Sequence, residues 1–165
     1  MRRVARAASA LAVAAVLTAG LTGCSVIGDI ISGTAGEDDV FTLAVGDCFN
    51  ETDDTSSGET IESVPIVDCK EEHDYEVYSS VIMDDEEYPG ETDTTSQAES
   101  QCLDAFEGFF GLSYDEAVTN DFTYFYPTTE SWGMGDREIL CMIVQLDEAG
   151  SSIVKTTGSL KGAGA

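Results

Sequence analysis

Five cysteines limit the folds that are open to this chain, and the first of them stands apart. Cys24 ends a hydrophobic amino-terminal stretch, whereas Cys48, Cys69, Cys102 and Cys141 are spread through the remainder. Four such cysteines in an exported chain form two disulfides, for which three connectivities exist. Their order favours Cys48–Cys69 and Cys102–Cys141, so that each bridge closes a loop within its own half of the sequence.

The amino-terminal stretch has the features of an export signal. A basic segment, Met1–Arg6, precedes a run of small and apolar residues, Ala7–Gly20. This run of about 14 residues is shorter than the roughly 20 that span a bilayer and has the length of a secretory hydrophobic region. It ends in Leu21-Thr22-Gly23-Cys24, which resembles a bacterial lipobox.

We therefore expect residues 1–23 to be a lipoprotein signal peptide and Cys24 to carry the lipid. Two or more acyl chains would hold the protein stably at the extracytoplasmic face of the cell membrane. The alternative is an ordinary signal peptide with a chance cysteine at this position.

The charge balance excludes one class of partner. The chain has 7 basic and 32 acidic side chains, a formal net charge of −25. Removal of residues 1–23, which contain three arginines and no acid, leaves 4 basic side chains and a net charge of −28. Nucleic acid is thereby excluded as a partner, because phosphate binding needs clustered Lys and Arg. A protein partner with a basic face is favoured instead.

Behind Cys24 the composition divides the chain into a tether and a domain. Residues 24–40 are rich in Gly, Ser, Thr and acids and are expected to form a flexible tether. Residues 41–162 are expected to form one extracytoplasmic domain. Within it, short hydrophobic runs predict strands at Ile61–Asp68, Tyr75–Met83, Phe122–Tyr126, Glu138–Leu146 and Ile153–Leu160.

A helix and a central strand complete the expected fold. The capping-box pattern Ser96–Glu99 predicts the start of a helix that carries Cys102 on its apolar face and ends at Gly111. A second, shorter helix is expected at 113–116. The continuous apolar run Ile139–Val144 indicates a strand buried on both faces. The predicted class is α+β: a small antiparallel sheet with one or two helices packed on one side and two disulfides.

Several short motifs, taken in order, resemble the septum formation domain of actinobacterial lipoproteins and membrane proteins. They cover roughly Gly46 to Val144 and are Gly46-Asp47-Cys48-Phe49, Val67-Asp68-Cys69, His73-Asp74-x-Glu76-Val77, Pro127-Thr128-x-x-Ser131-Trp132 and Gly135-Asp136-Arg137-Glu138-x-x-x-Cys141. The resemblance implies a surface role in division or envelope growth. It implies no reaction and no catalytic residue.

Four residues of these motifs, His73, Trp132, Asp136 and Arg137, are candidate site residues of unknown role. His73 is either a general base or a turn histidine whose ring bonds locally, and the second reading is favoured because no activated nucleophile accompanies it. Trp132 is expected in the core rather than exposed as a binding anchor. Arg137 is expected to form a bidentate pair with a carboxylate, and recognition of an anionic ligand is the alternative.

No metal site, cofactor or catalytic residue is expected. The acidic turn Asp84–Glu87 lacks the ligand spacing of a calcium loop and is read as a solvated turn. Zinc is a weaker alternative to disulfides, because the cysteines lie far apart and His73 is the sole histidine.

The expected function is therefore that of a lipid-anchored, non-enzymatic surface domain that binds an envelope or division protein. A small hydrolase that uses His73 and a calcium-linked adhesion module are the alternatives.

Overall fold

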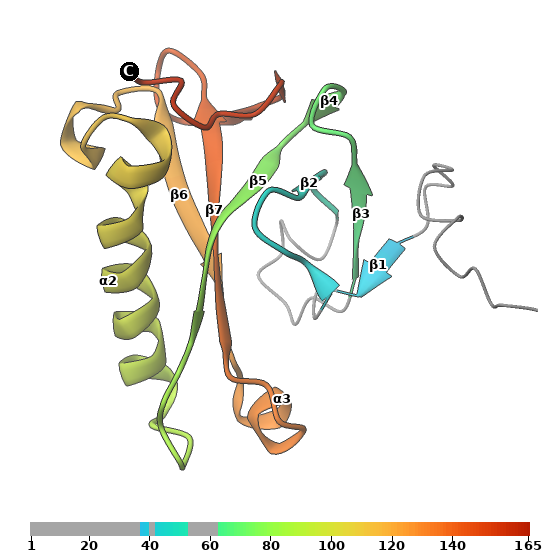
Figure 1. Cartoon of the computed structure of the whole chain (residues 1–165), viewed down its shortest axis with the longest axis vertical. Helices are drawn as coiled ribbons and strands as arrows, with labels where there is room; N and C mark the ends of the chain where they lie inside the picture. The colour runs from blue at the N-terminus through green and yellow to red at the C-terminus, as the bar shows by residue number, and fades with distance from the viewer. Residues whose placement is uncertain (1–36, 40–41, 53–62) are drawn as a thin grey trace, which may run out of the picture. The chain divides into compact units, whose positions relative to one another are not determined.

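The computed structural model describes residues 37–39, 42–52 and 63–165 (Figure 1). The predicted signal peptide, Cys24 and most of the predicted tether lie outside these residues. So does much of the loop between Cys48 and Cys69. In the part of the chain that is described, no helix is long and apolar enough to cross a membrane.

The described strands form a curled antiparallel sheet of seven strands and a separate two-stranded pair (Figure 1). Six strands of the main sheet follow the order β1-β3-β2-β5-β7-β6. The seventh, β8, pairs with β7 and lies outside this order. Its strands are β1 (Glu37–Asp39), β2 (Cys48–Phe49), β3 (Ser63–Val67), β5 (Tyr75–Ile82), β6 (Asn120–Phe125), β7 (Glu138–Leu146) and β8 (Ile153–Val154). The second pair consists of β4 (Glu72–His73) and β9 (Thr156–Thr157). β1 lies within the residues predicted to form the tether and pairs with β3.

Strand β7 lies at the centre of the main sheet, between β5 and β6, as its sequence predicts. Ile139, Cys141 and Ile143 belong to the core cluster on the helical side of the sheet. Leu140, Met142 and Val144 alternate with them and belong to the cluster on the opposite face. Burial on both faces explains why this segment reads as a continuous apolar run.

The long helix α2 spans Glu91–Phe110 and therefore begins earlier than the predicted capping box. The Ser96 hydroxyl does not cap an amino terminus; it donates to the Thr92 carbonyl, 2.8 Å away, one turn back along the same helix. The first turn instead carries Glu91 and Asp93, whose charges suit the positive end of the helix dipole. The predicted end is confirmed: Gly111 adopts a left-handed conformation with φ of 99°.

Helices α2 and α3 (Thr129–Gly133) pack on one side of the sheet, which confirms the predicted α+β class. The buried face of α2 contributes Ala98, Cys102, Phe106 and Phe110 to the helical-side core, and α3 contributes Trp132. The second predicted helix is a single 3₁₀ turn, η2 (Tyr114–Glu116). Sequence analysis missed α3 altogether.

Both disulfides join the cysteines in the order that the sequence favours. Cys48 is bonded to Cys69, which ties β2 to the turn after β3. Cys102 is bonded to Cys141, which ties α2 to the central strand through the core.

The carboxyl-terminal segment, residues 153–165, returns over the end of the sheet where β5 begins. β9 pairs with β4, and the Leu160 side chain is buried in the helical-side core. The buried Glu76 carboxylate accepts hydrogen bonds from the Ser159 hydroxyl, at 2.5 Å, and from the Leu160 amide, at 2.6 Å. These contacts satisfy a charge that would otherwise be costly to bury.

Candidate binding pocket

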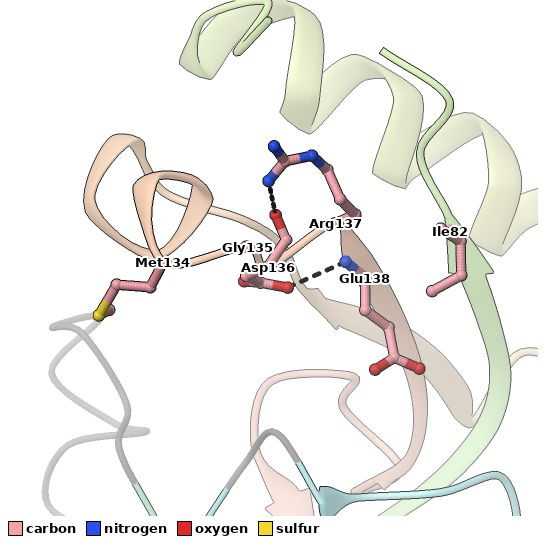
Figure 2. Close-up of a pocket in the computed structure, with 6 residues that line it drawn as sticks. All are labelled: Ile82, Met134, Gly135, Asp136, Arg137 and Glu138. Atoms are coloured by element: carbon pink, nitrogen blue, oxygen red, sulfur yellow. Dashed lines mark hydrogen bonds between the residues drawn. The ribbon is translucent and has the colours of Figure 1, made fainter. Parts of the chain in front are cut away.

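A pocket of about 560 Å³ lies between the turn that leads from α3 into β7 and the end of β5 (Figure 2). It is lined by Ile82, Met134, Gly135, Asp136, Arg137 and Glu138. Two of the predicted site residues, Asp136 and Arg137, therefore belong to one site.

Helix α3 and the turn behind it are held by hydrogen bonds that centre on Ser131. The Thr128 hydroxyl accepts from the Ser131 amide at 3.1 Å, while the Ser131 hydroxyl accepts from the Thr128 amide at 2.9 Å. This reciprocal arrangement is a capping box in which Ser replaces the usual Glu or Gln. Asp136 extends it, because its carboxylate accepts from the Ser131 hydroxyl and from the Glu138 amide, each at 2.9 Å.

Arg137 makes different contacts from those predicted. Its Nη1 donates to the carbonyl of Trp132 at 2.8 Å and to that of Asp136 at 2.6 Å. Its guanidinium carbon lies 3.7 Å from the centroid of the Trp132 ring, a cation–π contact. No ion pair to Arg137 occurs among the described residues, so the predicted carboxylate pair is not found in this part of the chain. The guanidinium instead binds one carbonyl in the last turn of α3 and one in the turn that follows it.

Trp132 is 7% exposed and packs in the helical-side core. This position is the one predicted, in preference to an exposed binding anchor. The Trp132 ring also contacts Tyr88, with 5.6 Å between centroids. Trp132 therefore contacts Arg137, which lines the pocket, and does not itself line it.

The pocket walls combine exposed apolar side chains with carboxylates. Ile82 is 62% exposed and Met134 is 72% exposed, and Figure 2 shows them on opposite sides of Asp136 and Glu138. The Glu138 carboxylate accepts a hydrogen bond from the Ser80 hydroxyl. Exposed apolar residues rimmed by polar groups are typical of surfaces that bind other molecules.

Sequence analysis did not identify Ile82 or Met134. They come from segments far apart in the sequence, and each looks ordinary in its local context. The glycines on both sides of Met134 were the one available signal of an exposed loop.

His73 lies away from this pocket, at the other end of β5. The start of β5 pairs with Val144 of β7, whereas the pocket forms where Ile82 pairs with Glu138. His73 is 0% exposed, and its Nδ1 is 2.9 Å from the Glu71 carbonyl, which matches the local ring contact predicted for a turn histidine.

The acidic turn Asp84–Glu87 gathers no set of three potential metal ligands within the described part of the chain. The one such group found there is formed by Cys48, His73 and Glu76.

These features define a small α+β domain with two disulfides and a pocket beside its short helix. A family model described as Septum formation matches residues 37–164, and the chain belongs to this family. The match spans all of the described strands and helices, and membership associates the chain with septum formation and the cell envelope. No curated protein and no solved structure matches the chain.

Proposed function

We propose that this protein is an exported, lipid-anchored interaction domain that acts in septum formation or envelope growth without catalysing a reaction. Cys24 would hold it at the extracytoplasmic face of the cell membrane. The pocket at Met134 and Ile82 would receive a segment of an envelope or division protein. The observation that carries this proposal is the pairing of two exposed apolar side chains on opposite walls of one pocket.

The charge of the domain indicates the chemistry of the bound segment. Asp136 and Glu138 line the pocket, and the positive charge of Arg137 is already directed at two backbone carbonyls. We expect a segment that inserts an apolar side chain between Ile82 and Met134 and places a Lys or Arg beside Glu138.

Two observations support a non-enzymatic role. His73 is fully buried, so its ring would reach a substrate only after the fold opens. The Glu76 carboxylate, a second buried candidate for acid–base chemistry, is occupied by Ser159 and Leu160. Neither group has the access that a general base needs.

The test places a photo-crosslinking residue at Met134 in growing cells and, as a matched control, at Val118. Val118 is 84% exposed and precedes β6 at the opposite end of the sheet. We expect a specific crosslinked partner from position 134 and none from position 118. Adding Ile82→Lys should abolish the crosslink and leave the melting temperature unchanged, because Ile82 is exposed and the new charge lies opposite Glu138.

Equal crosslinking from both positions would contradict the pocket as the binding site. Normal division and envelope growth in cells that carry Ile82→Lys and Met134→Glu together would contradict its role in that process.

A further inference from the structure

The His73 ring has the orientation and hydrogen bonding typical of a metal-binding histidine. Nδ1 lies 2.9 Å from the Glu71 carbonyl, so Nδ1 carries the proton and donates it, and Nε2 is left as an acceptor. Nε2 is fully buried and has no hydrogen-bond partner among the described residues. Metal-binding histidines are commonly oriented in this way, by a bond from one ring nitrogen to a backbone carbonyl.

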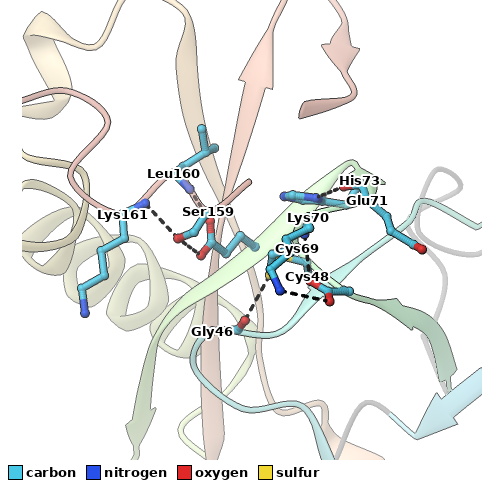
Figure 3. The surroundings of a disulfide bond; sticks show 11 residues. Gly46, Cys48, Cys69, Lys70, Glu71, His73, Ser159, Leu160 and Lys161 are labelled. Atoms are coloured by element: carbon cyan, nitrogen blue, oxygen red, sulfur yellow. Dashed lines mark hydrogen bonds and ion pairs between the residues drawn. A yellow bond between two sulfur atoms is a disulfide. The ribbon is translucent and has the colours of Figure 1, made fainter. Parts of the chain in front are cut away.

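Two further potential ligands surround this ring. One ligand atom each from Cys48, His73 and Glu76 lie within 4.8 Å of one another, and all three residues are buried. Figure 3 shows the His73 ring directed toward the Cys48–Cys69 bridge. Glu76 is positioned in turn by Ser159 and Leu160, which supply the outer hydrogen bonds that metal-binding carboxylates require.

The disulfide is what keeps this site from binding a metal, because thiolates rather than disulfide sulfurs are the ligands of metal ions. We propose that Cys48–Cys69 is the oxidised form of a zinc site. In the reduced form, Cys48 Sγ, His73 Nε2 and a Glu76 oxygen hold Zn²⁺, and Cys69 Sγ takes the fourth position.

The reaction balances with a dithiol reductant. The reductant transfers two electrons and two protons to the bridge, is itself oxidised to a disulfide, and leaves Cys48 and Cys69 as thiols. Binding of Zn²⁺ then releases the two thiol protons. A disulfide oxidant accepts two electrons from the two thiolates and is itself reduced to a dithiolate; the Cys48–Cys69 bridge forms again, two ligands are lost and the ion is released.

Zinc fits this donor set better than calcium or magnesium. Two thiolates and an imidazole are soft and borderline ligands, whereas calcium and magnesium select oxygen. Zinc bonds of about 2.0–2.3 Å in a tetrahedron place the ligand atoms roughly 3.3–3.8 Å apart. The present limit of 4.8 Å therefore requires a contraction of about 1 Å, within reach of side-chain rotation.

Reduction would reach this bridge before the other one. Cys69 is partly exposed in the turn between β3 and β4, whereas Cys102 and Cys141 are both 0% exposed. A soluble reductant can therefore attack Cys69 Sγ while the core bridge stays intact.

Variants of the two cysteines test the site without any reductant. Cys69→Ser and Cys48→Ser each destroy the bridge but keep three of the four proposed ligands, whereas the double variant Cys48→Ser with Cys69→Ser keeps only His73 and Glu76. Purified without oxygen and titrated with Co²⁺, the Cys69→Ser variant should bind one equivalent with a sulfur-to-cobalt charge-transfer band, and Zn²⁺ should displace it. Affinity should be at least tenfold weaker in the double variant Cys48→Ser with Cys69→Ser and in Cys69→Ser combined with Glu76→Gln.

The reduced wild-type chain gives an independent measurement if Cys69→Ser does not fold. After treatment with a dithiol and removal of the reductant, Zn²⁺ should raise its melting temperature and slow the return of the Cys48–Cys69 bridge. Equal affinity in Cys69→Ser and in the double variant Cys48→Ser with Cys69→Ser would overturn the proposal. So would a reduced wild-type chain that reoxidises at the same rate with and without Zn²⁺.

Discussion

Two buried tyrosines show how single residues tolerate the acidic surroundings. The Tyr78 hydroxyl donates to the Cys102 carbonyl of α2 at 2.7 Å, and burial raises the pKa of Tyr78 well above its ordinary value of 10.0. Burial, followed by the Glu51 and Asp74 carboxylates, raises the pKa of Tyr75 to about 12. In both cases the neutral phenol is the form that fits the fold.

These pKa values predict a loss of stability at high pH. A group whose pKa is raised by folding contributes fully below its unfolded pKa, near 10, and its contribution is lost as pH rises through the folded value. Tyr78→Phe should therefore cost about 1 kcal/mol at pH 7, the value of one hydrogen bond, and should lose less stability than wild type between pH 10 and 12. Urea unfolding across this range measures both effects, and parallel wild-type and variant curves would refute the prediction.

At the scale of elements, the two disulfides stabilise the fold in different ways. Cys48–Cys69 fixes a turn beside the short strands β2 and β3. Cys102–Cys141 crosses the core and holds α2 against β7, which is the strand that both β5 and β6 pair with. The second bridge therefore supports the contact between the two main layers.

Removal of the core bridge should be the more costly change. Loop closure alone predicts about 3 kcal/mol for the pair separated by 21 residues and about 4 kcal/mol for the pair separated by 39. Cys102→Ala with Cys141→Ala also leaves unfilled core volume, which should add roughly 1–2 kcal/mol. Chemical denaturation of this double variant and of Cys48→Ala with Cys69→Ala compares them; equal costs would contradict this assignment.

The sequence predicts those elements whose burial is uniform along their length. β7 has the predicted bounds, because residues buried on both faces leave a continuous apolar run. The sequence does not predict the start of α2, because the first residues of this helix have the composition of a loop. Thr94 is buried by tertiary packing, which stabilises this segment as part of the helix. The helix α3 is too short to show periodicity, and its cap uses Ser131 in place of an acid.

The sequence does not predict the full set of residues that line the candidate pocket, for a related reason. Arg137 was predicted to pair with a carboxylate, the most abundant partner in this chain. Its guanidinium instead donates to the Trp132 carbonyl and contacts the Trp132 ring. Only the pairing of β5 with β7 brings Ile82 to the same pocket as Met134.

At the scale of the whole molecule, the negative charge and the proposed lipid would have opposite effects on binding to a membrane. The segment from residue 24 onward has a net charge of −28, so an anionic membrane surface repels it. The membrane attachment proposed above would then come from the lipid on Cys24 and not from electrostatic contact.

Attachment through a lipid rather than through charge predicts how the protein behaves in membrane fractions. The wild-type protein should incorporate a labelled fatty acid and should stay with membranes through a wash at high salt, which releases proteins held by charge. Cys24→Ala should lose the label, whereas Cys48→Ala, a matched removal of another cysteine, should keep it. Labelling of Cys24→Ala, or release of the wild-type protein by salt, would contradict the anchor.

The contact between Glu76 and the carboxyl-terminal segment also imposes an order in time. Leu160, whose amide binds this buried carboxylate, lies 84 residues further along the chain. A chain that leaves the cell amino end first exposes Glu76 long before Leu160 arrives, and until then water must solvate that charge. β5 can therefore be sealed into the sheet only after residue 160 has emerged. If the chain is exported as proposed, folding would follow export and could not supply the force that drives it, so the emerging chain would depend on its own solubility, which its acidic side chains provide.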